Sequence, residues 1–156
     1  MKHRPRKPAR GFTLLELLVV LVIAGLTLGM VSFNAMPSER QVLQKESQRI
    51  ALLLQLARDE AIVRNRPIAF EADTQGYHFL LRDENVWQPL SQDELLRNRP
   101  FQRPPVTVTL TPQQQQAGLR IVFGREPVDK PFVLTLSAGD SSAAIRADGI
   151  GHFIVE

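Results

Sequence analysis

The sequence contains no cysteine, which excludes a disulfide framework and any thiol chemistry. Histidine is scarce too, and His78 and His152 each stand alone in a predicted strand, where a structural or exposed role is usual. Neither a phosphate-binding glycine loop nor a nucleophile–base pairing is recognisable. We therefore predict a protein without enzymatic activity and without a cofactor.

Metal binding is not indicated either. Two acidic pairs, Asp83-Glu84 and Asp93-Glu94, lie in predicted loops. Because Ca²⁺ takes six to eight oxygen ligands, a solvated turn is the preferred interpretation of each pair. We predict no metal site.

Charge is almost absent from one long stretch. From Phe12 to Phe33 the sole ionisable side chain is Glu16. As a helix this stretch is roughly 33 Å long, and the hydrocarbon core of a bilayer is about 30 Å thick. Residues 12–36 are therefore predicted to form a transmembrane helix. A carboxylate in such a helix costs up to about 3 kcal/mol on insertion, so Glu16 is expected to have a partner.

The net charge of +3 is concentrated before this stretch. Five basic residues precede it: Lys2, Arg4, Arg6, Lys7 and Arg10. Without them, 14 basic side chains stand against 16 acidic ones, a net charge of −2. The basic cluster is therefore a topology signal: the N-terminus stays in the cytoplasm, and the C-terminal part lies across the membrane.

Residues 37–66 are predicted to form an amphipathic helix. Pro37 is expected to kink or break the preceding helix, and Ser38 and Gln41 can form a capping box that starts a new one. The helix is expected to end at Asn65-Arg66-Pro67. One side of this helix carries a mostly apolar stripe, which needs a sheet to cover it. The stripe contains Val42, Leu43, Glu46, Ile50, Leu53, Ala57, Ala61 and Ile62.

Residues 67–156 are predicted to form a β-rich globular domain. Strands are expected at 68–70, 77–81, 86–87, 106–110, 119–123, 132–136, 143–147 and 152–155, with Asp148-Gly149 as a hairpin turn. Trp87 is expected in the core, and Ser91 with Glu94 is expected to cap a single helical turn. The fold class is α+β: a long N-terminal helix, with a transmembrane and an amphipathic half, packed on a C-terminal antiparallel sheet or β-sandwich.

The segment Gly11-Phe12-Thr13-Leu14-Leu15-Glu16, after a basic leader, resembles the class III signal of type IV pilins and type II secretion pseudopilins. The resemblance implies that prepilin peptidase removes residues 1–11 by cutting between Gly11 and Phe12, and then methylates Phe12. It also implies that Glu16 pairs with the amine of a neighbouring subunit and sets axial register. A secretory signal peptide or a plain signal anchor leaves these residues unexplained.

The segment Ala57–Asn65 resembles the helix end of H-type minor pseudopilins of type II secretion. This resemblance implies a structural subunit at or near the pseudopilus tip, in the inner membrane and periplasm, that helps export folded proteins. The implied partners are the I–J–K tip complex, the major pseudopilin, prepilin peptidase and the assembly platform. The charged face of the helix, with Arg40, Lys45, Arg49 and Asp59, is expected to be free for these neighbours. Arg58 is also expected at the surface, so reversing Arg49 and Arg58 to Glu should weaken partner binding and leave the fold intact.

Two alternatives remain at this point. One is a minor pilin of type IV pili, acting in pilus assembly or DNA uptake; the other is an enzyme held by an ordinary anchor. DNA binding depends on Lys and Arg that neutralise phosphates. Residues 38–156 carry 14 basic and 15 acidic side chains and end in Glu156, so we expect no nucleic-acid partner.

Overall fold

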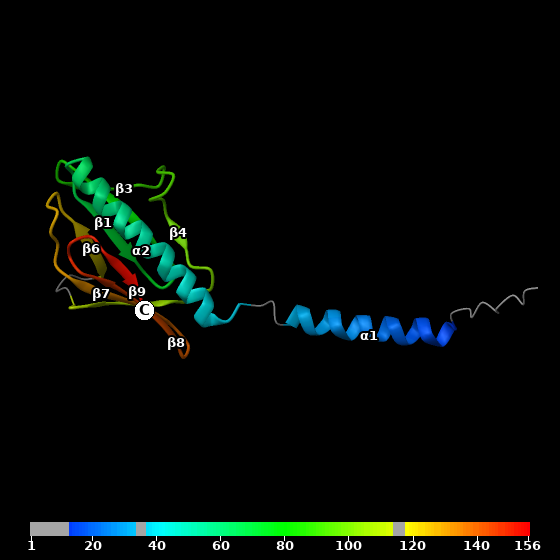
Figure 1. Ribbon diagram of the computed structural model, residues 1–156. Helices are drawn as coiled ribbons and strands as arrows, with labels where there is room; N and C mark the ends of the chain where they lie inside the picture. Colours follow the sequence, from blue (N-terminus) through cyan, green and yellow to red (C-terminus); the bar gives the residue numbers. More distant parts are fainter. Residues whose placement is uncertain (1–12, 34–36, 114–117) are drawn as a thin grey trace, which may run out of the picture. The chain divides into compact units, whose positions relative to one another are not determined.

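The computed structural model describes residues 13–33, 37–113 and 118–156. The chain divides into two compact units, residues 1–37 and 38–156. The first contains helix α1 (Leu14–Phe33), drawn in blue in Figure 1. The second contains helix α2 (Glu39–Val63) and all the strands.

Thr13 caps the start of helix α1, whose first residue is Leu14. The Thr13 hydroxyl accepts a hydrogen bond from the Glu16 N–H at 3.3 Å, and its carbonyl accepts from the same N–H at 3.0 Å. Within the described residues, no helix combines the length and apolar character that a membrane crossing requires. The predicted span of residues 12–36 includes Phe12 and residues 34–36, which lie outside the described residues.

Helix α2 starts and ends as its sequence predicts. Ser38 and Gln41 form a reciprocal capping box, with bonds of 3.1 and 3.2 Å. At the other end Asn65 adopts a φ of 54°. The N–H groups of Asn65 and Arg66 donate to the carbonyls of Ile62 and Ala61, which is a Schellman motif. The predicted bounds of 37–66 are thus slightly wider than the helix.

The strands form two antiparallel sheets. The first has the order β3 (Val86–Pro89), β2 (Gly76–Asp83), β1 (Ile68–Ala72) and β6 (Leu119–Phe123), and β4 (Arg99–Pro100) also pairs with β2. The second has the order β5 (Thr107–Thr111), β7 (Phe132–Ala138), β8 (Ser141–Ala147) and β9 (Phe153–Val155). Figure 1 shows α2 alongside these sheets, where it contacts β1 and β6 of the first and β7, β8 and β9 of the second.

The core lies between α2 and the two sheets. Leu54 of α2, Phe70 and Phe79 of the first sheet, and Ile145 of the second are all fully buried. The rings of Phe70 and Phe79 are 5.3 Å apart. This burial of the α2 stripe confirms that the amphipathic half packs on a β-rich domain.

Two expectations need correction. Residues 91–97 contain no helical turn, because the Asp93 carboxylate, rather than Ser91, accepts bonds from the N–H groups of Leu95 and Leu96. Trp87 lies outside the core cluster, on a surface described below. The expected break at Pro37 is present, since Pro37 and Ser38 are not helical.

Candidate functional site

The expected processing and register residues lie at the start of the chain. Gly11 and Phe12 lie outside the described residues. Glu16 is the third residue of α1 and is exposed. Its position follows from Thr13, which caps the helix three residues earlier. The bond to Thr13 comes from the Glu16 backbone N–H, which leaves the exposed carboxylate available to a partner.

The described side chains of α1 are mostly apolar and exposed, including Leu14, Leu15, Leu21 and Leu28. The Thr27 hydroxyl donates within the helix, to the carbonyls of Ile23 and Ala24 at 3.0 and 2.9 Å. The polar group of Thr27 is therefore satisfied without an outside partner.

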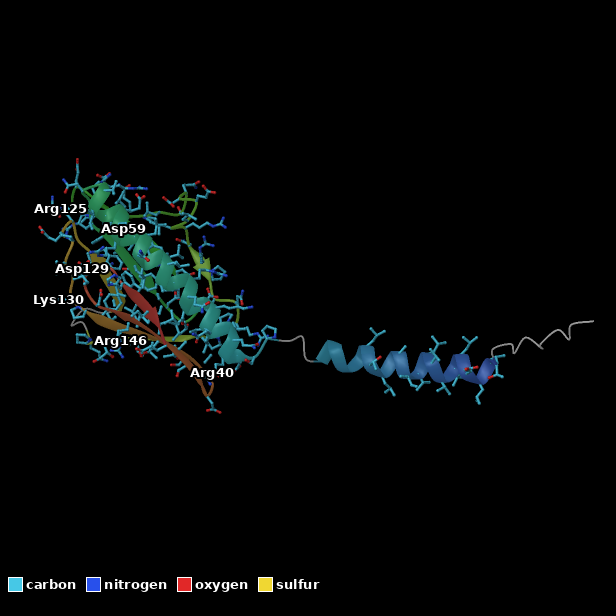
Figure 2. The ribbon with its side chains drawn as sticks, viewed as in Figure 1. Arg40, Asp59, Arg125, Asp129, Lys130 and Arg146 are labelled. Carbon is cyan, nitrogen blue, oxygen red and sulfur yellow. The ribbon has the colours of Figure 1, made fainter. Side chains whose placement is uncertain are left out.

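The charged face of α2 is only partly free. Arg40, Lys45 and Asp59 are exposed (Figure 2 labels Arg40 and Asp59). Arg49 bonds to Glu46 at 3.1 Å, and Glu46 is only 2% exposed. Arg58 is 9% exposed. The expectation that Arg58 is free for neighbours is therefore wrong, because this chain itself covers its guanidinium.

Arg58 joins α2 to two loops. Its guanidinium donates to the Pro127 carbonyl and lies 3.6 Å from the Asp129 carboxylate. Asp129 in turn donates from its N–H to the Gly149 carbonyl at 2.7 Å. A Cβ on Gly151 would lie 2.7 Å from an Arg58 nitrogen, so the loop also packs directly on the guanidinium. Burial raises the pKa of Asp129, and the Arg58 charge partly offsets this.

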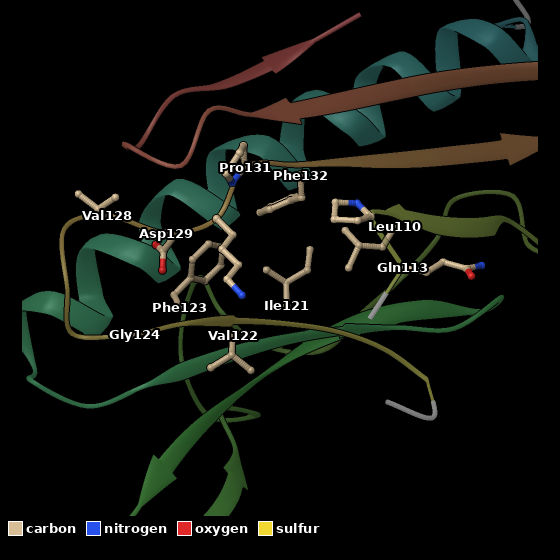
Figure 3. A pocket seen from close by; sticks show the side chains of 12 residues that line it. Leu110, Gln113, Ile121, Val122, Phe123, Gly124, Val128, Asp129, Pro131 and Phe132 are labelled. Atoms are coloured by element: carbon tan, nitrogen blue, oxygen red, sulfur yellow. The ribbon is translucent and has the colours of Figure 1, made fainter. Parts of the chain in front are cut away.

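A cleft of about 1100 Å³ opens between the two sheets beside β6. Figure 3 shows its mostly apolar wall, formed by Leu110, Ile121, Phe123, Val128 and Phe132. Asp129 and Lys130 are its charged lining residues. One of these two, Asp129, already faces Arg58, so the described lining holds no acid–base set for catalysis.

The face of the first sheet that points away from α2 carries a polar cluster. Glu71 of β1 pairs with His78 of β2 at 3.0 Å and with Arg120 of β6. The Arg82 and Arg120 guanidinium carbons lie 5.7 and 5.5 Å from the centre of the Trp87 ring. We call Glu71, His78, Arg82, Trp87 and Arg120 the Trp87 face. Sequence spacing did not reveal it, because its residues come from four strands.

The two histidines of residues 38–156 each meet one carboxylate. His78 meets Glu71, and His152 lies 2.6 Å from Asp148. Neither of these two pairs includes a nucleophilic side chain. Among the described residues, no group of three metal-ligating side chains is present.

Two family models match the chain. Residues 46–151 match the family described as type II transport protein GspH. Residues 6–32 match the prokaryotic N-terminal methylation motif. The motif and the family indicate a membrane-anchored periplasmic protein.

Curated relatives agree with these matches. Type II secretion system protein H of Pseudomonas aeruginosa is 30% identical over 145 residues, which cover 87% of this chain and 80% of that protein. The protein of the same name from Aeromonas hydrophila is 31% identical over 90 residues, covering 55% of this chain and 49% of that protein.

Solved structures share the fold. The minor pseudopilin EpsH of Vibrio cholerae superposes with a TM-score of 0.59 at 15% identity, covering 76% of this chain and 95% of that one. The type IV minor pilin FimU of P. aeruginosa gives 0.55 at 18% identity, with coverages of 76% and 90%. Since both systems share the fold, the choice between them rests on the family model and the curated relatives, and these do not favour the type IV pilin alternative. The chain belongs to the GspH family and is an H-type minor pseudopilin of type II secretion.

Proposed function

We propose that this chain occupies a position at or near the tip of the type II secretion pseudopilus and helps to move folded proteins through the outer membrane. One observation carries the proposal: a single chain joins the N-terminal methylation motif to a GspH-type domain. A pseudopilus subunit needs both, because the first part inserts it into the filament and the second distinguishes it from other subunits.

The N-terminus of the mature protein is Phe12. Prepilin peptidase cleaves between Gly11 and Phe12, and the new amine of Phe12 is methylated. The methylation-motif match over residues 6–32 supports this site. Cleavage also removes the five basic residues of the leader, which leaves Phe12 one residue before the Thr13 cap.

Residues 12–36 anchor the mature chain in the bacterial inner membrane as a single span. The N-terminus is cytoplasmic before cleavage, and residues 37–156 lie in the periplasm. The absence of ionisable side chains other than Glu16 between Phe12 and Phe33 supports this topology. So do the basic residues that precede the span.

Assembly joins this subunit to unlike neighbours. The proposed partners are the I–J–K tip complex and the major pseudopilin, with insertion by the inner-membrane assembly platform. Glu16 faces the α-amine of a neighbouring chain in the membrane, where each charge would be costly alone. The protein acts as a structural part and is not an enzyme; it is a substrate of the peptidase.

Intact-mass measurement of the chain extracted from membranes tests this proposal. We expect the loss of residues 1–11 and the addition of one methyl group at Phe12. Gly11→Ala should leave the full-length chain, whereas Ala9→Gly, two residues earlier in the leader, should be processed normally. Wild-type protein left uncut beside an active peptidase would contradict the proposal.

A second measurement addresses the place of action. Deleting the gene should stop export through the secretin, and the intact gene should restore it. If the deletion removes pili and leaves secretion unchanged, the protein works in the other system.

A further inference from the structure

Trp87 is the single tryptophan of the chain, yet it lies outside the core. It belongs to β3, and its strand partner at the same register is Arg82 of β2. The Arg120 guanidinium, 5.5 Å from its ring, comes from β6. Because β2 and β1 separate β3 from β6, at about 4.8 Å per strand, the ring must extend across the sheet to meet Arg120.

Two apolar residues of the same sheet face are buried. Ala69 and Leu80 are 0% and 8% exposed, and they are paired across β1 and β2. Neither belongs to the main core cluster, since their neighbours Ile68, Phe70 and Phe79 take the inner face. Trp87 stands on the same sheet face, paired with Arg82 two residues along β2 from Leu80, and its side chain remains partly exposed.

The charges around the ring do not cancel. Glu71 neutralises Arg120 and also contacts His78. Arg82 donates to the neutral amide of Asn85 at 2.6 Å. In the described part of the chain, no carboxylate pairs with Arg82. The face thus offers a fixed aromatic ring beside a guanidinium whose charge is not balanced.

We propose that the Trp87 face is the surface on which an acidic patch of a neighbouring pseudopilin docks. The inference rests on the proposed function, and it names the surface and the chemistry of the partner. Tryptophan and arginine are the residues most often found to dominate binding energy at interfaces. A partner carboxylate can bind the Arg82 guanidinium through two parallel hydrogen bonds while the ring limits its motion.

An acidic protein surface fits this face better than a membrane does. The partly exposed Trp87 ring lies beside the Arg82 and Arg120 guanidinium groups, which restrict it as they would not restrict a freely projecting, membrane-inserting side chain. Glu71 already pairs with Arg120, which leaves Arg82 as the one arginine of the Trp87 face without a carboxylate partner in the described residues. Charge-driven binding to anionic lipid typically uses clusters of about 4–8 basic residues, whereas a protein partner needs to place only one carboxylate at Arg82.

The single tryptophan allows a direct test. The full chain, labelled with 5-fluorotryptophan and held in nanodiscs of zwitterionic lipid, gives one ¹⁹F signal, from Trp87. We expect this signal to shift when the purified complex of I-, J- and K-type minor pseudopilins is added. It should not shift when the nanodisc lipid is changed to include phosphatidylglycerol. A shift with the anionic lipid and none with the complex would overturn the inference in favour of a membrane surface.

Binding affinity gives the second readout. Arg82→Glu should weaken binding of the complex about tenfold, and Arg82→Lys should weaken it less, because lysine keeps the charge and loses the planar fork. Arg125→Glu is the matched control, since this exposed arginine (labelled in Figure 2) makes the same charge change on the β6–β7 loop. We expect its affinity to stay within about twofold of wild type.

The outcomes separate the two proposals. If the complex binds with an unshifted ¹⁹F signal and Arg82→Glu binds as tightly as wild type, the docking surface is wrong and the tip placement stands. If the wild-type chain binds neither the tip complex nor the major pseudopilin, the proposed function fails and this inference fails with it. Circular dichroism of each variant checks that the fold is retained; Trp87→Phe, which keeps an aromatic ring at this position, should retain it.

Discussion

Arg58 and Glu16 are both charged residues on helices, but their surroundings differ. The Arg58 side chain is enclosed by the Pro127 carbonyl, the Asp129 carboxylate and the Gly151 backbone. Glu16 is exposed in the isolated chain and stands in the first turn of α1. A substitution at Arg58 is therefore expected to act on folding, whereas Glu16 is proposed to act in assembly.

Arg58→Ala should lower the free energy of unfolding by roughly 2–3 kcal/mol. Removing one member of a buried pair typically costs about 3–5 kcal/mol, and the Asp129 side chain keeps 20% exposure, which reduces this. Arg40→Ala, on the exposed part of the same helix, should change it by less than about 0.5 kcal/mol. Urea unfolding followed by circular dichroism measures both, and equal midpoints would show that Arg58 does not hold the loops.

Glu16→Gln and Glu16→Ala separate a register role of the Glu16 charge from a capping role of its side chain. Glutamine at the third helical position keeps a side chain that can bond the Thr13 N–H, as glutamate does in a capping box. It removes the charge that is proposed to pair with a neighbouring amine. We expect both variants to insert into the membrane and both to lose secretion. Secretion retained by Glu16→Gln and lost by Glu16→Ala would assign Glu16 to capping rather than to register.

At the scale of single elements, the sequence predicted well what local chemistry determines. The break at Pro37, the capping box at Ser38 and the end of α2 at Asn65 depend on neighbouring residues, and each was predicted from them. The hairpin at Asp148-Gly149 joins β8 to β9 for the same reason.

What the sequence could not show depends on contacts between distant residues. The burial of Arg58 requires the 127–129 loop, which is about 70 positions away. Trp87 was assigned to the core because large aromatic side chains usually lie there. Its ring instead lies beside two arginines, from β2 and β6. Ser91 was expected to be the capping residue, but the Asp93 carboxylate accepts the bonds from Leu95 and Leu96, because Ser and Asp side chains both bond nearby backbone N–H groups.

The β8–β9 hairpin gives a prediction for pH. The Ile150 N–H chiefly, with the His152 side chain and N–H, lowers the pKa of Asp148 to about 2. Since the folded pKa lies below the unfolded one, the carboxylate stabilises the fold above pH ~4, and this contribution is lost as pH falls through ~2. Asp148→Asn retains the side-chain oxygen that accepts from Ile150 but does not titrate.

We therefore expect the stability difference between wild type and Asp148→Asn to be constant above pH ~4 and to shrink between pH ~4 and ~2. Urea unfolding at several pH values measures this. Asp140→Asn, at the β7–β8 turn, is the matched control for removing one exposed acid. A difference that stays constant down to pH 2 would show that the hairpin does not hold the carboxylate as described.

At the scale of the whole molecule, the charges of residues 38–156 are mixed rather than segregated. Six arginines lie in ion pairs: Arg49–Glu46, Arg58–Asp129, Arg64–Glu60, Arg66–Asp83, Arg120–Glu71 and Arg146–Glu156. Binding to DNA relies on Lys and Arg side chains that neutralise phosphates and thereby release the counterions condensed on the DNA. An arginine that already pairs with a carboxylate of its own chain does not contribute to this release.

This pairing predicts that the protein does not bind DNA, in line with a place in secretion rather than DNA uptake. In a gel shift at ~1 μM protein and ~0.15 M salt, wild type should give no retarded band, because nonspecific dissociation constants are about 10⁻⁴–10⁻⁶ M even for basic proteins. A variant that combines Glu71→Gln, Asp83→Asn and Glu156→Gln frees Arg120, Arg66 and Arg146. It should bind more strongly than wild type at ~0.05 M salt and lose the difference as salt rises. A wild-type band at ~0.15 M salt would mean that pairing within the chain does not limit phosphate binding, and would reopen the DNA-uptake alternative.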